Sequence, residues 1–241
     1  MSAPEQPSSR TSAPVRPWRG VSASQRTAER RERLIEAALE VFADRGYAAS
    51  TVRDVCRAAG LTERYFYESF RNREALLEAL ADRIVDDSMA AVAPALADPT
   101  RELEEVVRDA LGRFVGSLVD DPRRAQVLLV ESVGASPPAE DRRREIMGHL
   151  AAITRQALAE ALGSEAPGEA DVDLTARALI GAGNELLVGY IRGELAIDRR
   201  RLTDHLVTLF LVAAPLSSSA ATERGPAHPR PSNSTGGDHG R

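Results

Sequence analysis

The sequence contains no lysine and a single cysteine among its 241 residues, so all 31 basic side chains are arginines. One cysteine excludes an internal disulfide framework and a cysteine-rich metal site. Aromatic residues make up only 4% of the chain although 43% is hydrophobic, which favours cores built from Leu, Val, Ile and Ala. Without lysine, any phosphate contact must come from guanidinium groups, hydroxyl groups or backbone N–H groups.

Long apolar runs are also missing. The best run, at 206–215, is interrupted by Thr208 and is shorter than the roughly 18 residues of a membrane span. The N-terminal stretch has no apolar signal core. The sequence therefore predicts a cytoplasmic protein with no membrane segment.

The sequence lacks the convergent set of polar side chains that an enzyme needs. Its four histidines are isolated, and its pairs of adjacent acidic residues would diverge on a helix rather than meet at one metal ion. No glycine-rich phosphate loop follows a strand, because no segment has a convincing strand pattern. We therefore expect no catalytic residue, no metal ligand and no cofactor, and the protein is not predicted to be an enzyme.

The net charge of −5 hides an asymmetry along the chain. Residues 1–73 carry 13 arginines and 9 acidic residues, whereas residues 74–241 carry 18 arginines and 27 acidic residues. These counts give net charges of +4 and −9. A basic front and an acidic remainder are typical of a DNA-contacting end joined to a body that stays off DNA.

The segment 51–77 predicts two short helices joined by a tight turn, followed by the start of a third helix. Thr51 stands three residues before Asp54, which is the spacing of a capping box. Gly60 can adopt the left-handed conformation that ends a helix, and Thr62 is a good N-cap for the next one. A short helix, a glycine turn and a second helix rich in Arg and Tyr are typical of a helix-turn-helix, which presents side chains to the major groove.

The second helix of this segment is expected to turn Phe66 and Phe70 inward and to carry polar and aromatic side chains outward. Arg64 has the donor pattern to fork onto a guanine. Glu63 is placed either to accept a cytosine amino proton or to cap its own helix. The predicted DNA-binding residues are Thr51, Arg53, Thr62, Glu63, Arg64, Tyr65, Tyr67, Arg71 and Arg73.

The run GYAASTVRDVCRAAGLTERYFYESFRNREALLEAL resembles the DNA-binding domain of the TetR/AcrR family of transcriptional regulators. Tyr67, Phe70 and Leu76 match the family's Tyr-x-x-Phe-x-x-(Lys)-x-x-Leu signature. Residues 59–61, Ala-Gly-Leu, match its Ala-Gly-Val/Ile turn. The resemblance implies a symmetric dimer, an all-helical second domain and an effector pocket in that domain.

The resemblance covers residues 30 to 84, with two departures. Arg73 stands where the family usually has lysine, and Cys56 stands where alanine is common. By resemblance, Tyr67 and Arg73 hold phosphates, and the N-terminus of the helix after Asn72 adds N–H groups for the same purpose. The expected partner is a pseudo-palindromic, double-stranded DNA operator.

The whole chain is predicted to be all-α, with an N-terminal three-helix helix-turn-helix DNA-binding domain and a C-terminal helical-bundle domain for ligand binding and dimerisation. We expect a disordered basic tail at 1–26, the DNA-binding domain at 27–73, the effector-binding and dimerisation domain at 74–215, and a disordered tail at 216–241. The first tail is either a floppy extension or an arm that touches phosphates or the minor groove. Outside the motif, helices are expected at about 27–45, 72–91, 99–119, 122–133, 139–162, 171–193 and 198–213.

The last two of these helices, 171–193 and 198–213, are apolar on more than one face and must be buried on more than one face. They are either the central core of one subunit or, as the resemblance implies, the homodimer interface. Asn184 is a polar residue within the first of them, and it is placed either to anchor a ligand or to fix the dimer register.

A small, mainly apolar effector is expected to bind between the helices of the second domain, although the same residues would form an ordinary filled core. The predicted lining is Phe114, Leu118, Leu128, Ile146, Leu150, Ile153, Ile180, Asn184 and Leu187. The sequence thus favours a dimeric transcriptional repressor released by its ligand. The alternatives are an all-helical interaction or scaffold protein with secondary DNA contact, and a ligand-independent regulator.

Overall fold

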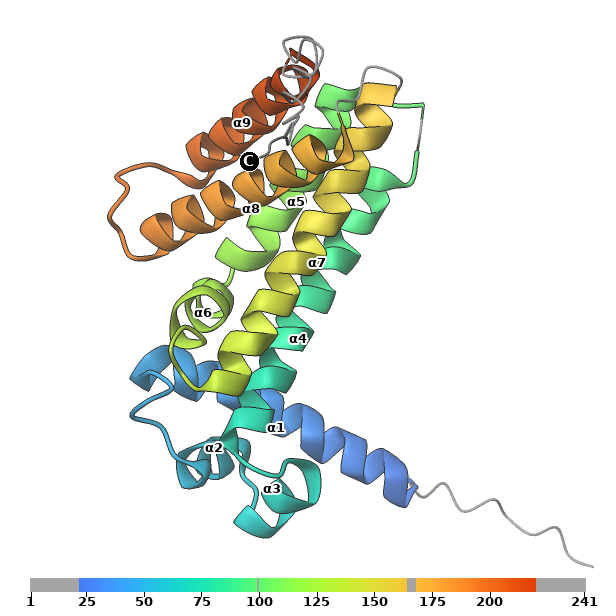
Figure 1. Cartoon of the computed structure of the whole chain (residues 1–241). Coiled ribbons are helices and arrows are strands. Elements are labelled where there is room, and N and C mark those ends of the chain that lie inside the picture. Colours follow the sequence, from blue (N-terminus) through green and yellow to red (C-terminus); the bar gives the residue numbers. More distant parts are fainter. Residues whose placement is uncertain (1–21, 99, 164–167, 220–241) are drawn as a thin grey trace, which may run out of the picture.

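Every regular element in residues 22–98, 100–163 and 168–219, the part that the computed structural model describes, is a helix (Figure 1). The elements are α1 (Ala23–Arg45), α2 (Val52–Ala59), α3 (Glu63–Ser69), α4 (Arg73–Val92), η1 (Ala93–Leu96), α5 (Leu103–Val119), α6 (Pro122–Ala125), η2 (Gln126–Glu131), α7 (Pro137–Leu162), α8 (Glu169–Ile191) and α9 (Arg199–Ser219). The predicted all-α fold is confirmed.

Helices α1, α2 and α3 pack into one module, in which α1 contacts both of the shorter helices. A seven-residue helix such as α3 is too short to be stable alone, so tertiary packing must hold it. Phe66 supplies that packing, because its side chain is fully buried together with Leu34 and Phe42 of α1 and Val55 of α2.

Helix α4 connects this module to the rest of the molecule. Asn72 caps it, since its side-chain oxygen accepts a hydrogen bond from the Ala75 N–H at 2.9 Å. Its buried face then contacts α1 at one end and α5 and α7 further on. In Figure 1, α4 and α7 run along the long axis, and α8 and α9 lie at the end opposite α2 and α3.

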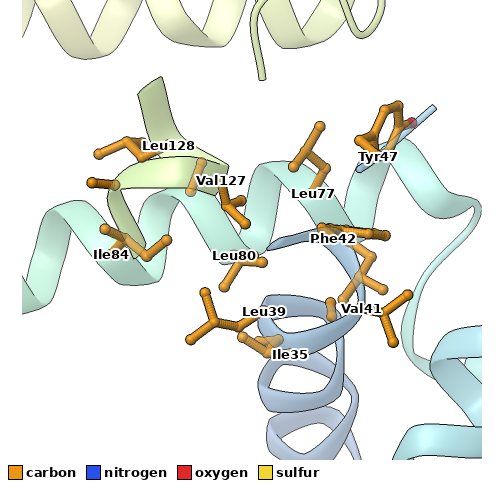
Figure 2. Packing of buried hydrophobic residues seen from close by; sticks show 14 of the residues in the cluster. Ile35, Leu39, Val41, Phe42, Tyr47, Leu77, Leu80, Ile84, Val127 and Leu128 are labelled. Atoms are coloured by element: carbon orange, nitrogen blue, oxygen red, sulfur yellow. The ribbon is translucent and has the colours of Figure 1, made fainter. Parts of the chain in front are cut away.

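The hydrophobic core runs from the helix-turn-helix module into the body without a break. Figure 2 shows Val127 and Leu128 of η2 beside Leu80 and Ile84 of α4, with Ile35 of α1 close by. The expected boundary at 73/74 coincides with the start of α4, where the chain continues as one helix. The module and the body are therefore mechanically joined by shared packing.

Two helix starts differ from the predictions by four residues. Helix α1 begins at Ala23 rather than Thr27, because Ser22 acts as its N-cap and accepts from the Gln25 N–H at 3.1 Å. Helix α5 begins at Leu103 rather than at 99. The Asp98 carboxylate accepts from the Thr100 N–H and hydroxyl, which makes a local turn there instead of a helix start.

The helix expected at 122–133 is interrupted. It starts at Pro122 as predicted, with Asp121 as its N-cap, but from Gln126 to Glu131 it is a π-helix. The Ser132 N–H donates to the Val127 carbonyl five residues back, and the Gln126 side chain likewise pairs with that of Glu131. A π-turn brings residues i and i+5 together, and local sequence gives no signal for it.

The C-terminal helix is longer than expected, since α9 extends to Ser219 and includes residues 216–219 that were assigned to the tail. The rest of that tail, residues 1–21 of the N-terminal tail and residues 164–167 lie outside the described residues.

Candidate nucleic-acid interface

The start of α2 has the capping box that the sequence predicts. Thr51 Oγ1 accepts from the Asp54 N–H at 3.2 Å, and Asp54 Oδ2 accepts from the Thr51 N–H at 3.1 Å. The hydrogen bond from the Thr51 hydroxyl is the main reason why the pKa of Asp54 lies below its usual value, and Arg45 and Arg57 contribute further. The cap therefore depends on an ionised carboxylate.

The turn between α2 and α3 also follows the prediction. Gly60 has φ 62° and ψ 36°, the left-handed conformation, and its N–H donates to the Arg57 carbonyl. Beneath the turn lies the buried thiol of Cys56, whose pKa is raised by burial. Thr62 stands at the N-cap position of α3, but its side chain makes no capping hydrogen bond, so that part of the prediction is wrong.

Helix α3 has the predicted inner and outer faces. Phe66 and Phe70 are buried, whereas the side chains of Tyr65 and Tyr67 are 37% and 59% exposed. The tyrosines, together with exposed Glu63 and Arg64, give α3 a polar and aromatic surface without disturbing its packing against α1.

Three arginines near α3 are exposed and only weakly paired. The shortest nitrogen–oxygen distance is 3.7 Å from Arg53 to Glu63, 3.2 Å from Arg64 to Glu68 and 3.9 Å from Arg71 to Glu78. Exposed ion pairs of this kind contribute little free energy. These guanidinium groups can therefore exchange their carboxylate partners for phosphates at low cost.

The predicted DNA-binding residues fall into separate groups. Four of them, Arg53, Thr62, Glu63 and Arg64, line one shallow, open concavity at the junction of α2 and α3. Tyr67 and Arg71 lie further along the chain, towards the start of α4, and Thr51 is engaged in the capping box.

Arg73 has structural partners that the sequence does not predict. Its Nη1 donates to the Ser50 carbonyl, and its guanidinium carbon lies 4.2 Å from the centre of the Tyr47 ring. Arg73 thereby connects the first turn of α4 to the loop between α1 and α2.

Three further arginines, all on α1, hold the motif in place and were missed by the sequence reasoning. Arg33 donates to the Ala59 carbonyl at the end of α2, and Arg31 donates to the Ser69 carbonyl at the end of α3. Arg30 lies 4.6 Å from the ring centre of Tyr65. The only available signal was their clustering on one stretch of α1, and their partners are too far along the chain for a local pattern to name them.

The predicted effector lining is dispersed in this structure. A cavity of about 20 Å³ lies between α4, η2 and α7, and only Leu128 and Ile146 of the predicted set line it. Leu118 and Leu187 are buried in the core, and Ile153 is 36% exposed. Phe114, Leu150, Ile180 and Asn184 are half-buried, and Asn184 Oδ1 is buried without a hydrogen-bond partner among the described residues.

The described ranges contain neither a metal-binding cluster nor a membrane-spanning helix. No group of three His, Cys, Asp or Glu side chains there is arranged to hold a metal ion. None of the helices in those ranges combines the length and apolarity that crossing a bilayer requires.

Comparison with known proteins places this geometry in a family. Residues 34–80, which run from α1 through the motif into α4, match the family model described as bacterial regulatory proteins, tetR family. The helix-turn-helix module belongs to the TetR family. The match covers the signature residues from which the resemblance was inferred, and it ends within α4.

Curated relatives support this assignment. The HTH-type transcriptional regulator YerO of Bacillus subtilis is 24% identical over 192 residues, which cover 74% of this chain and 62% of YerO. The HTH-type transcriptional repressor KstR2 of Mycolicibacterium smegmatis is 31% identical over 105 residues, covering 43% of this chain and 49% of KstR2. The matched parts span less than two thirds of either relative. Both are named as regulators rather than enzymes.

A solved structure shares the overall fold. The transcriptional regulator FadR from Bacillus subtilis, determined in complex with stearoyl-CoA, superposes with a TM-score of 0.63 at 22% identity and covers 76% of this chain and 98% of its own. The likeness extends beyond the TetR-type module into the helical body, which therefore has the fold of such a regulator.

Proposed function

We propose that the protein is a dimeric, sequence-specific DNA-binding transcriptional regulator, a repressor that a small, mainly apolar ligand releases from a pseudo-palindromic operator. The observation that carries the proposal is the exposed surface of α3, with Arg64, Tyr65 and Tyr67 presented on a module whose core is fully packed. A rigid module with an exposed polar helix is what reading base edges requires.

On DNA, α3 would lie in the major groove with its first residues towards the bases. Arg64 would give up Glu68 to fork onto a guanine, a contact worth about 1–3 kcal/mol of discrimination. Arg53 and Arg71 lie on either side of α3 along the chain and would hold phosphates, as would the N–H groups at the start of α4. Arg73 would act mainly by fixing that start of α4.

The dimer would form through α8 and α9. These helices lie at the end of the molecule opposite α3 and still expose apolar or small residues, including Leu174, Gly181 and Val212. Pairing them with a second copy would cover these surfaces and leave α3, the recognition helix, free in both copies. The two copies of α3 would then meet successive major grooves about 34–36 Å apart.

The ligand would act by moving α4. The cavity of about 20 Å³ is far smaller than the roughly 300–1,000 Å³ of ligand pockets, so an effector must part α4 from α7 to enter. Since α4 continues from the helix-turn-helix module formed by α1, α2 and α3, here called the recognition module, that movement would displace α3. The stearoyl-CoA bound to FadR makes long-chain acyl-CoAs the first compounds to test.

Selection from a random-sequence duplex pool by the purified protein tests the DNA-binding function. The expected result is enrichment of one sequence with two related half-sites, bound by the wild type and at least tenfold more weakly by Arg64→Ala. Arg113→Ala, which removes an exposed arginine from α5 in the body, is the matched control and should bind as the wild type does. The proposal fails if no sequence is enriched at moderate salt.

A further inference from the structure

Glu131 joins the body of the protein to the recognition module. It is the last residue of the π-helix η2, and its Oε2 accepts a hydrogen bond from the Tyr47 N–H at 2.8 Å, across 84 positions of sequence. Its Oε1 accepts from Gln126 Nε2, also at 2.8 Å. Both carboxylate oxygens are thus engaged, one within η2 and one in the loop between α1 and α2.

The loop is shaped to receive this carboxylate. Gly46 has φ 79°, a conformation that favours glycine, and a Cβ there would lie 3.2 Å from Glu131 Oε2. The missing side chain leaves the Tyr47 N–H accessible to Glu131. A hydrogen bond between an amide and a charged acceptor is stronger than one between neutral groups.

From Tyr47 the contacts lead to the recognition helix. The Tyr47 ring is buried, packs edge-on against Phe42 and carries the guanidinium of Arg73 on its face. Arg73 also donates to the Ser50 carbonyl and is the first residue of α4, three positions beyond Phe70, the C-cap of α3. The Glu131 hydrogen bond therefore acts on the framework that orients α3.

The π-helical geometry makes this contact sensitive to the state of the body. If η2 returned to α-helical hydrogen bonding, each N–H would bond four residues back rather than five. Glu131 would then rotate by about 100° around the helix axis. The Tyr47 hydrogen bond would then break. Val127 and Leu128 of the same turn pack against α1 and α4 in the shared core (Figure 2), so a change in η2 would also alter that packing.

We propose that Glu131 is a positioning residue for DNA binding: it latches the loop between α1 and α2 to η2 and so holds α3 in its binding orientation. The inference rests on the proposed function. When the latch is lost, the module samples other orientations, and the apparent DNA affinity falls in proportion to the competent fraction. Glu131 itself does not touch DNA.

The test compares three variants on the duplex that the wild type selects from a random pool, with binding followed by fluorescence anisotropy. Glu131→Ala should bind about tenfold more weakly. Glu131→Gln keeps an oxygen for the Tyr47 N–H and should stay within about twofold of the wild type. Glu140→Ala removes the same charge and a similar bond, to the Gly134 N–H, outside the recognition module, and should also stay within twofold.

Hydrogen exchange at the Tyr47 amide gives a second readout that a general loss of stability would not reproduce. It should quicken in Glu131→Ala, stay slow in Glu131→Gln, and leave amides in α8 unchanged. If Glu131→Ala does not fold, Gln126→Ala, which frees the other carboxylate oxygen, should weaken DNA binding about threefold.

The latch is overturned if the folded Glu131→Ala protein binds within twofold of the wild type, if Glu131→Gln loses as much affinity as Glu131→Ala, or if Glu140→Ala weakens binding equally. When Gln126→Ala is the variant measured, unchanged binding overturns it. A wild-type protein that enriches no sequence refutes the DNA-binding function instead, so the two failures are distinguishable.

Discussion

Arg71 offers a quantitative test of which cations meet DNA. Its side chain is 72% exposed at the junction of α3 and α4, and its nearest carboxylate oxygen, on Glu78, is 3.9 Å away. Each phosphate contact in B-DNA contributes about −0.9 to the slope of log affinity against log salt concentration. A dimer contains two copies of Arg71, so Arg71→Ala should make the slope shallower by about 1.8.

The predicted change is large enough to measure directly. Between 50 and 200 mM salt, a slope difference of about 1.8 shrinks the advantage of the wild type over Arg71→Ala roughly twelvefold. Fluorescence anisotropy titrations of the selected duplex at four or five salt concentrations give both slopes. Because the predicted quantity is a slope, an overall change in affinity from another cause does not imitate it.

The control removes the same charge elsewhere. Arg113 lies on α5 in the body, is 45% exposed and pairs with Asp109 at 2.6 Å. Arg113→Ala should leave the slope unchanged. The reasoning is refuted if Arg71→Ala alters the slope by less than about 0.5, or if Arg113→Ala alters it as much.

Three further predictions concern the cap, the core and the dimer. Asp54→Asn should lower the midpoint of urea unfolding at neutral pH. Because the pKa of Asp54 is depressed in the folded protein, the difference in stability between the wild type and Asp54→Asn should shrink as the pH falls below about 4. Phe66→Ala should cost about 3–5 kcal/mol of unfolding free energy, and an unchanged urea midpoint would contradict the packing described. Gly181→Arg should give a folded monomer in sedimentation velocity, since a Cβ there meets nothing within 4 Å of the same chain. Gly148→Arg on α7, where a Cβ is equally unobstructed, should remain a dimer. A dimeric Gly181→Arg protein would exclude this face of α8 from the interface.

The parts of the motif that the sequence predicts are those determined by near neighbours. Thr51 and Asp54 are three residues apart, and the left-handed turn at Gly60 needs only a glycine at the end of a helix. The burial of Phe66 and exposure of Tyr67 follow from the helical period. All of these depend on a few adjacent residues, which a single sequence displays.

The contacts that a single sequence does not display join distant residues. The bond from Tyr47 to Glu131 spans 84 positions, and Arg73 meets Ser50 from 23 positions away. The π-turn in η2 has no local marker either, because its geometry depends on packing against α1 and α4. The effector lining stays a prediction for a related reason: helical period places apolar residues inside, but whether they enclose a space depends on how the helices meet.

The buried thiol beneath the turn gives the protein a natural reporter of its own breathing motions. Cys56 is the chain's single cysteine, and on α2 it is only 4% exposed. A bulky alkylating reagent reaches it only when the module opens, so the labelling rate measures the free energy of that opening. Mass spectrometry of the intact chain then follows one site without any introduced label.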